Sequence, residues 1–169
     1  IRSWPIFAAA TPMIGWLSSL LVLKVIGDLG EQLELLNRMI NSHQGPFVLV
    51  VFLLIAVMPG VGEELLFRGY LQTRLLARLP SGAAIAISSL IFAAAHMDPI
   101  HVVAVLPLGI WFGTVAWRTG SVIPAILCHV VNNGSAIVLN QLGSNDAADA
   151  ALGSAELGII GVSALALLA

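Results

Sequence analysis

Long apolar runs recur along this chain, and each is close to the length that an α-helix needs to cross a lipid bilayer. A crossing helix takes about 20 mostly apolar residues. The runs cover residues 6–27, 46–61, 82–96, 101–117, 122–142 and 152–169, and an amphipathic stretch at 62–79 continues the second run. No run alternates with a period of two, which argues against a barrel. The pattern predicts an all-α, polytopic transmembrane helical bundle.

Composition agrees with a chain embedded in a lipid bilayer. Charged residues make up 9% of the chain, against about 25% in soluble domains. The net charge of −2 leaves no basic face for nucleic acid, so we expect no nucleic-acid partner. The length predicts a single transmembrane domain over residues 1–169. A start at Ile1, without methionine, fits a fragment with further helices before Ile1 or after Ala169.

Loop charges predict an orientation if residues 46–79 cross the bilayer once, as a long helix with a break near Pro59 and Gly60. Acidic residues then gather at one set of junctions and arginines at the other, with Lys24 and Arg38 as exceptions. The arginines at the second set are Arg2, Arg74, Arg78 and Arg118. Because basic loops stay inside the cell, we expect the arginine side to face the cytoplasm. For a compact chain of this kind, a prokaryotic plasma membrane is the default expectation.

Polar side chains interrupt the apolar runs at three places. Such groups are costly at bilayer depth and are therefore candidates for function. They are Glu63, Glu64 and Arg68 in the second run and its extension, His96 in the third, and His129 and Asn133 in the fifth. A helix rise of 1.5 Å per residue puts Glu63, His96, Asn133 and His129 roughly 12–25 Å deep. Three helices thus bring polar groups to one layer, which predicts a buried polar active-site cavity.

Spacing predicts how some of these groups pair. Glu64 and Arg68 have the i,i+4 order that favours an ion pair on a helix, which would leave Glu63 free for chemistry. His129 and Asn133 share a helical face by the same spacing. The structural alternatives are a satisfied internal network of the two glutamates with the arginine, a hydrogen-bonded core histidine, and ordinary hydrogen bonds between helices.

Two hydrolytic mechanisms fit this set of residues. Peptide hydrolysis needs a base that activates water and donors that hold the oxyanion. Glu63 with His96 could activate the water while His129 and Asn133 hold the oxyanion. Alternatively, Glu63, His96 and His129 could bind Zn²⁺, since two histidines and a carboxylate form a known catalytic set. Glu64 would then be the base, and the sequence does not separate these two mechanisms.

Other residues are expected to have structural roles. Gly109 and Gly113 form a small-xxx-small pair, which is typical of closely packed helices. His43 and His101 fall at loops or helix ends, where we expect them to be solvated.

The three polar motifs resemble those of the type II CAAX-prenyl endopeptidase and bacteriocin-processing (CPBP) family of intramembrane proteases, also called the Abi family. The family pattern is Glu-Glu-x-x-x-Arg, then Phe-x-x-x-His, then His-x-x-x-Asn or a similar small polar residue. In this chain the motifs begin at Glu63, Phe92 and His129, in that order. The resemblance covers residues 46–142, the expected protease-like core.

This resemblance implies a glutamate-dependent endopeptidase whose active-site cavity opens to the cytoplasm. Such proteins are membrane hydrolases that have also been described as metalloproteases. It implies a protein or peptide substrate, prenylated or of the bacteriocin type, met within the lipid bilayer. The roles that it implies are water activation by Glu63 with His96, oxyanion binding by His129 with Asn133, and support by Glu64 and Arg68. Metal dependence is contested in the family.

Two other classes of function stay open at this point. A non-catalytic membrane immunity or scaffold protein of the same fold would keep its phenotype in Glu63→Gln and His129→Ala variants. A transporter or ion pathway would use buried glutamate and histidine as a proton relay. The broken helix is not repeated elsewhere in the chain, which disfavours a transporter.

Overall fold

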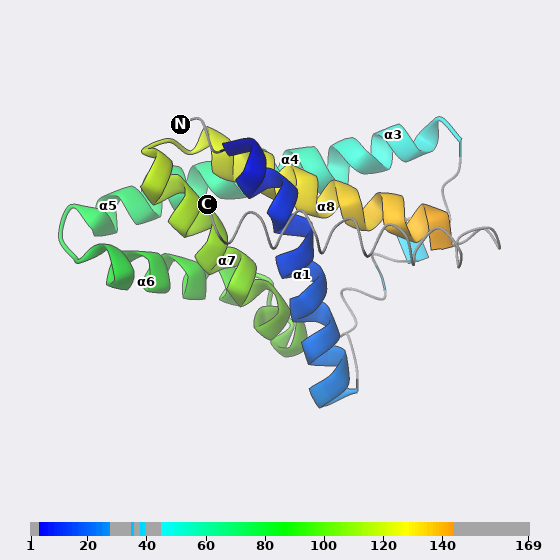
Figure 1. Ribbon diagram of the computed structural model, residues 1–169, viewed down its shortest axis with the longest axis horizontal. Coiled ribbons are helices and arrows are strands. Elements are labelled where there is room, and N and C mark those ends of the chain that lie inside the picture. The colour runs from blue at the N-terminus through cyan, green and yellow to red at the C-terminus, as the bar shows by residue number, and fades with distance from the viewer. Residues whose placement is uncertain (1–3, 28–34, 36–37, 40–44, 144–169) are drawn as a thin grey trace.

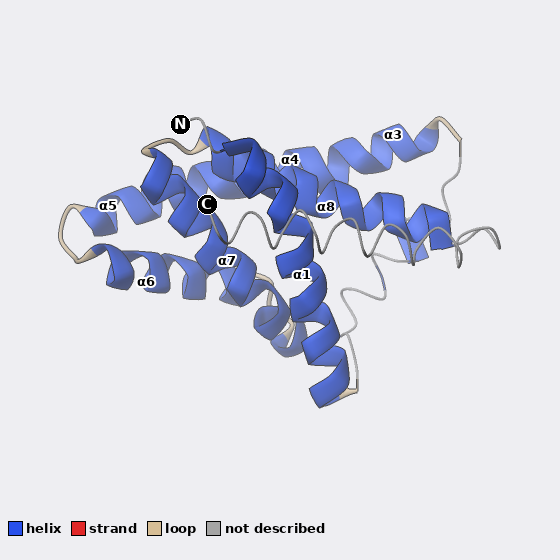
Figure 2. Ribbon diagram, viewed as in Figure 1, coloured by secondary structure: helices blue, strands red, loops and turns tan. Residues whose placement is uncertain are grey.

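The computed structural model describes residues 4–27, 35, 38, 39 and 45–143, and this part of the chain is helical with no strand (Figure 2). The predicted all-α class is confirmed. The main elements are α1 (Trp4–Ile26), α3 (Phe47–Phe52), η1 (Leu53–Val57), α4 (Met58–Glu64), η2 (Leu65–Gln72), α5 (Thr73–Leu76), α6 (Ser81–Ala94), α7 (Pro99–Thr119) and α8 (Ile123–Gly143). The apolar run at 152–169 and His43 lie outside the described residues.

Three of the helical stretches are long and apolar enough to cross a membrane, namely Pro5–Ile26, Phe47–Leu76 and Pro99–Thr119. Two shorter apolar stretches follow the predicted runs, at Ser81–Ala94 and Ile123–Leu139. The predicted single crossing by residues 46–79 therefore corresponds to one continuous helical stretch. The direction of the chain across the bilayer stays a prediction.

The long helical stretch does not stop at Pro59, although its hydrogen-bond pattern changes on both sides of that residue. Two π-helical segments, η1 and η2, flank the short α4 that contains Pro59. Proline lacks the N–H that an α-helix needs, and π-helical segments accommodate such local departures and are frequent at functional sites. The expected break is thus a local change of helix type. Glu64 is the last residue of α4, and Arg68 belongs to η2.

The helices pack so that α7 and α8 lie at the centre of the site. The part of the long stretch from α3 to α4 runs beside α8, and η2 and α5 pack against α6 (Figure 1). In turn, α6 packs against α7, and α1 crosses both α7 and α8. A core cluster of Phe67, Phe92, Ala93 and Val105 joins η2, α6 and α7. Residues far apart in sequence are thereby brought into contact, and the depth of the polar groups in the bilayer stays a prediction.

Glycines allow the helices to approach closely where the site is built. A Cβ atom on Gly109 would lie 3.1 Å from Cδ1 of Phe92, and one on Gly113 would lie 2.6 Å from Oε1 of Gln72. A Cβ atom on Gly60 would lie 2.7 Å from Cγ2 of Val130 on α8. The close-packing role predicted for Gly109 and Gly113 is confirmed, and Gly60 does the same one turn before Glu63.

Candidate active site

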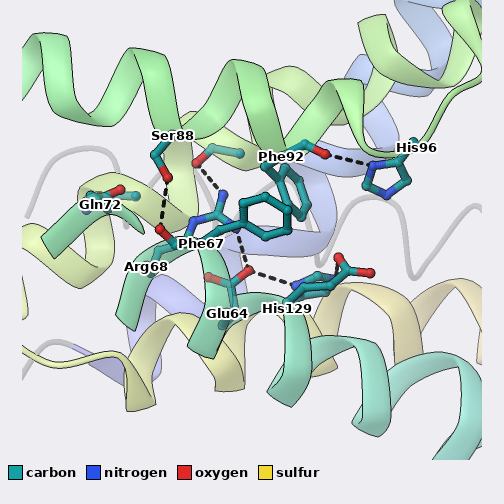
Figure 3. Close-up of polar contacts among 11 residues, drawn as sticks. Glu64, Phe67, Arg68, Gln72, Ser88, Phe92, His96 and His129 are labelled. Carbon is teal, nitrogen blue, oxygen red and sulfur yellow. Dashed lines mark hydrogen bonds and ion pairs between the residues drawn. The ribbon is translucent and has the colours of Figure 1, made fainter. Parts of the chain in front are cut away.

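Glu64 is the centre of a buried polar network that links two helical stretches. Its Oε1 accepts a hydrogen bond from Nη1 of Arg68 at 2.8 Å, and both side chains are fully enclosed. The same oxygen lies 2.9 Å from Nδ1 of His129 on α8 (Figure 3). The Glu64–Arg68 pair predicted from the i,i+4 spacing is present, and His129 joins it from another helix.

Arg68 is held by contacts that use both its charge and its planar shape. Its Nη2 donates to the backbone oxygen of Gly109 at 2.8 Å. Its Cζ lies 4.3 Å from the ring centroid of Phe92 and 5.5 Å from that of Phe112. Guanidinium groups favour such aromatic faces as well as planar hydrogen bonding. Arg68 therefore fixes Glu64 against both α6 and α7.

Contacts on three sides determine the orientation of the His129 ring. It stacks on Phe112 with centroids 4.9 Å apart and an interplanar angle of 17°, and it meets the edge of Phe92 at 6.0 Å. An ionised Glu64 oxygen can only accept a hydrogen bond, so Nδ1 of His129 carries the hydrogen in the 2.9 Å contact. Its Nε2 then points away from Glu64, toward Glu63.

Glu63 differs from its neighbour in almost every contact. Its side chain keeps 34% of its surface exposed, and its Oε2 lies 4.0 Å from Nε2 of His129. That distance is too long for a hydrogen bond, and Oε2 is itself enclosed without a hydrogen-bond partner. Of the two adjacent carboxylates, Glu63 is therefore the one whose side chain is partly exposed and whose Oε2 has no hydrogen-bond partner.

His96 lies at the edge of this group, on the other side of Phe92. Its Nδ1 lies 3.1 Å from the backbone oxygen of Phe92, and its ring meets the Phe92 edge at 5.2 Å (Figure 3). Among the described residues, no hydrogen bond or ion pair joins His96 to Glu63. The structure therefore brings Glu63, Glu64 and His129 into direct proximity, and His96 reaches them through Phe92.

Asn133 lies one turn after His129 and bonds to the backbone of the long helical stretch. Its Nδ2 donates to the backbone oxygen of Ile55 at 3.1 Å, and its Oδ1 accepts from Nδ2 of Asn132 at 3.2 Å. Ile55 belongs to the π-helical η1. The amide of Asn133 is thus oriented, with one of its two N–H groups outside these bonds.

The proposed zinc ligands do not form a metal site in this arrangement. In the part of the chain that the structure describes, no three histidine, cysteine, aspartate or glutamate side chains are grouped closely enough to hold a metal ion. Glu63 and His129 approach each other, but His96 lies beyond Phe92, and no hydrogen bond or ion pair joins it to Glu63. In this arrangement the three side chains do not fit a zinc site.

Sequence reasoning missed several residues that build the site. Gln72 lies one turn after Arg68 and repeats its contact, since its Nε2 donates to the backbone oxygen of Gly113 at 2.9 Å. The sequence does contain a sign of this contact. Arg68 and Gln72 are four residues apart, as are the two glycines, Gly109 and Gly113, whose backbone oxygens they bind. Contacts between separate helices, such as the stacking of Phe112 on His129, leave no comparable spacing.

Comparisons with known proteins agree with the geometry at the level of the family. The family model described as type II CAAX prenyl endopeptidase Rce1-like matches residues 45–135, which span all three polar motifs. The search of curated proteins and the search of solved structures returned no match. Because the family model covers more than half of the 169 residues, this chain belongs to the type II CAAX prenyl endopeptidase Rce1-like family.

Proposed function

We propose that this protein is an intramembrane endopeptidase in which Glu63 activates the water that cleaves a peptide bond. The contrast between two adjacent carboxylates carries this proposal. Glu64 is enclosed and holds Arg68 and His129. The Glu63 side chain is 34% exposed and has no comparable partner. A general base needs an uncommitted lone pair within reach of water, so Glu63 is the better candidate.

In the proposed reaction, Glu63 takes a proton from water while the water oxygen attacks the carbonyl carbon of the scissile bond. The carbonyl oxygen becomes an oxyanion, which N–H groups of His129 and Asn133 hold. The carbon–nitrogen bond then breaks, and the proton on Glu63 passes to the leaving amine. His96 assists Glu63 by orienting the water.

His129 can hold the oxyanion only through its Nε2, because its Nδ1 already contacts Glu64. Its Nδ1 hydrogen is directed to Glu64 at 2.9 Å, so a second hydrogen on Nε2 is required for donation to an oxyanion. The protonated ring would then lie between the two carboxylates, with Glu64 at its Nδ1 side and Glu63 at its Nε2 side. Glu64 and Arg68 support catalysis by fixing this ring.

Asn133 is suited to supply the second oxyanion donor. One N–H of its amide is used by the backbone oxygen of Ile55, and the other remains for a ligand. The bond from Asn132 to its Oδ1 keeps the amide from turning over. Preorganised donors of this kind need no rearrangement when charge develops on the substrate.

The substrate that we propose is a protein or peptide with a prenylated CAAX-type C-terminus, because the family description names such endopeptidases. A bacteriocin-type peptide is the alternative substrate class. The protease core would occupy residues 46–142 of a single transmembrane domain over 1–169. We further propose a prokaryotic plasma membrane as the location, with the site open to the cytoplasm.

The proposal is tested by cleavage in proteoliposomes that contain the purified protein. The substrate is a farnesylated peptide with a CAAX terminus, and the same peptide without the lipid is run in parallel. We expect wild-type protein to release the terminal fragment and Glu63→Gln to reduce the rate by about 10²–10⁴-fold. Arg74→Gln, which removes an exposed charge from the same helical stretch, is the matched control and should cleave normally.

Two outcomes of this experiment would overturn the assignment. Full activity in Glu63→Gln would remove Glu63 from the chemistry. Cleavage of neither peptide by wild-type protein would overturn the CAAX-type substrate. Comparison of membrane-protein termini in cells that produce wild type or Glu63→Gln would then decide between another peptide substrate and a non-catalytic role.

A further inference from the structure

A second histidine outside the three motifs packs directly against His96. The rings of His96 and His101 have centroids 4.9 Å apart and are tilted by 44°. His101 was expected to be solvated, and the residue is partly exposed, but its Nδ1 is buried and has no hydrogen-bond partner. The expectation fails for this nitrogen because α7 folds back onto the end of α6 after a very short turn.

That turn is held in an unusual backbone conformation. Met97 has φ +57°, the left-handed region that non-glycine residues rarely occupy. Asp98 then caps α7, because its Oδ1 accepts from the backbone N–H groups of Ile100 at 2.9 Å and His101 at 3.2 Å. Met97 is 87% exposed, so packing of its own side chain does not explain its backbone. Such strain persists where the surrounding contacts impose it, and here the result is the approach of His101 to His96.

The ring of His96 is therefore constrained by three neighbouring groups. The backbone oxygen of Phe92 can only accept, so Nδ1 of His96 carries the hydrogen in their 3.1 Å contact. The Phe92 ring meets His96 edge-on, and His101 packs against it as well. In the neutral ring this tautomer leaves Nε2 as the nitrogen with a free lone pair.

We propose that His101 is a positioning residue that holds the His96 ring in the orientation with Nε2 available for the reaction. His101 acts through the contact of its ring, which a phenylalanine would reproduce and a leucine would not. The catalytic part of this inference rests on the proposed function, whereas the effect on the His96 ring does not.

The variants His101→Phe and His101→Leu form a matched pair. Both remove the buried, unpartnered nitrogen and fill the space with an apolar group, and only the first keeps a planar ring. Val103→Ala, at an exposed position on the same turn of α7, controls for truncation near the start of that helix.

The first measurement is the ¹⁵N spectrum of the imidazole groups in detergent-solubilised protein. The chain has four histidines, so a His96→Gln variant assigns the His96 signals. We expect signals of the Nδ1–H tautomer in wild type, His101→Phe and Val103→Ala, and averaged signals of two tautomers in His101→Leu. Unchanged His96 signals in His101→Leu would overturn the proposal, whether or not the protein cleaves a peptide.

The second measurement is the rate of peptide cleavage. Misplacing a catalytic group lowers the turnover rate more than substrate binding. We expect His101→Leu to lower kcat by about tenfold or more with KM nearly unchanged, and His101→Phe to restore kcat. Equal losses in the two variants would overturn the role of the ring contact. A wild-type protein that cleaves no peptide would count against the proposed function alone, because the spectrum still decides the role of His101.

Discussion

The two sides of the His129 ring meet very different surroundings. On the Nδ1 side, Glu64, Arg68 and the backbone oxygen of Gly109 form a continuous chain of hydrogen bonds of 2.8–2.9 Å, closed off from solvent. On the Nε2 side, Glu63 is 4.0 Å away and partly exposed. The first, or bonded, side links the helices, and in the proposed mechanism the second, or reactive, side holds the group that activates water. Under that proposal, one motif supplies a structural carboxylate and a catalytic one in consecutive positions.

The strongest way to break this contrast is to remove the charge on the bonded side. Glu64→Gln leaves the Arg68 guanidinium enclosed beside a neutral partner, and losing one partner of a buried pair costs about 3–5 kcal/mol. We expect that loss in unfolding free energy, together with loss of cleavage. Glu63→Gln is the isosteric control and should unfold like wild type. Equal stability of wild type and Glu64→Gln, measured by denaturation in detergent, would contradict the structural role of Glu64.

The reactive side is tested by truncating Asn133, the proposed oxyanion donor. Loss of one such donor lowers kcat by about 10²–10³-fold in a well-studied protease, so we expect about a hundredfold loss in Asn133→Ala. Asn132→Ala is the control, because Asn132 only orients the Asn133 amide, and it should lose less than tenfold. A smaller loss in Asn133→Ala than in Asn132→Ala would exchange the roles of the two asparagines.

A substitution at Gly109 tests how closely α6 and α7 must pack next to the bond between Arg68 and the Gly109 oxygen. A Cβ atom there would meet Phe92 and Ser89 at 3.1 and 3.2 Å, next to the oxygen that Arg68 binds. Overpacking of this kind costs about 1–3 kcal/mol, so Gly109→Ala should unfold earlier and cleave more slowly. Thr114→Ala, on the same helix, should have little effect. A Gly109→Ala variant as stable as wild type would show that α6 and α7 can separate freely.

The sequence predicted contacts within one helix better than contacts between helices. The pairing of Glu64 with Arg68 follows from a four-residue spacing, and the apolar runs that fall within the described residues correspond to helical stretches. The bond between His129 and Glu64 joins residues 65 positions apart, so no local pattern encodes it. The position of His101 depends on the left-handed conformation at Met97, which a non-glycine residue does not predict.

The smallest effect is expected at Gln72, where the bonded side ends. Its Nε2 donates to Gly113, while its Oε1 is buried without a partner. The bond contributes about 0.5–1.5 kcal/mol, and an unpaired buried acceptor costs about 1–3 kcal/mol. Gln72→Met removes both the hydrogen bond and the unpaired acceptor while keeping the approximate shape of the side chain.

We therefore expect a change in unfolding free energy of less than about 1 kcal/mol, or a small gain. Cleavage should be unchanged, because the bonds among Glu64, Arg68 and His129 do not involve Gln72. Thermal unfolding and the proteoliposome assay measure the two effects separately. If Gln72→Met lost cleavage by more than tenfold at unchanged stability, the reactive side would extend along η2 beyond Arg68. The contrast between a bonded side at Nδ1 of His129 and a reactive side at Nε2 would then be wrong.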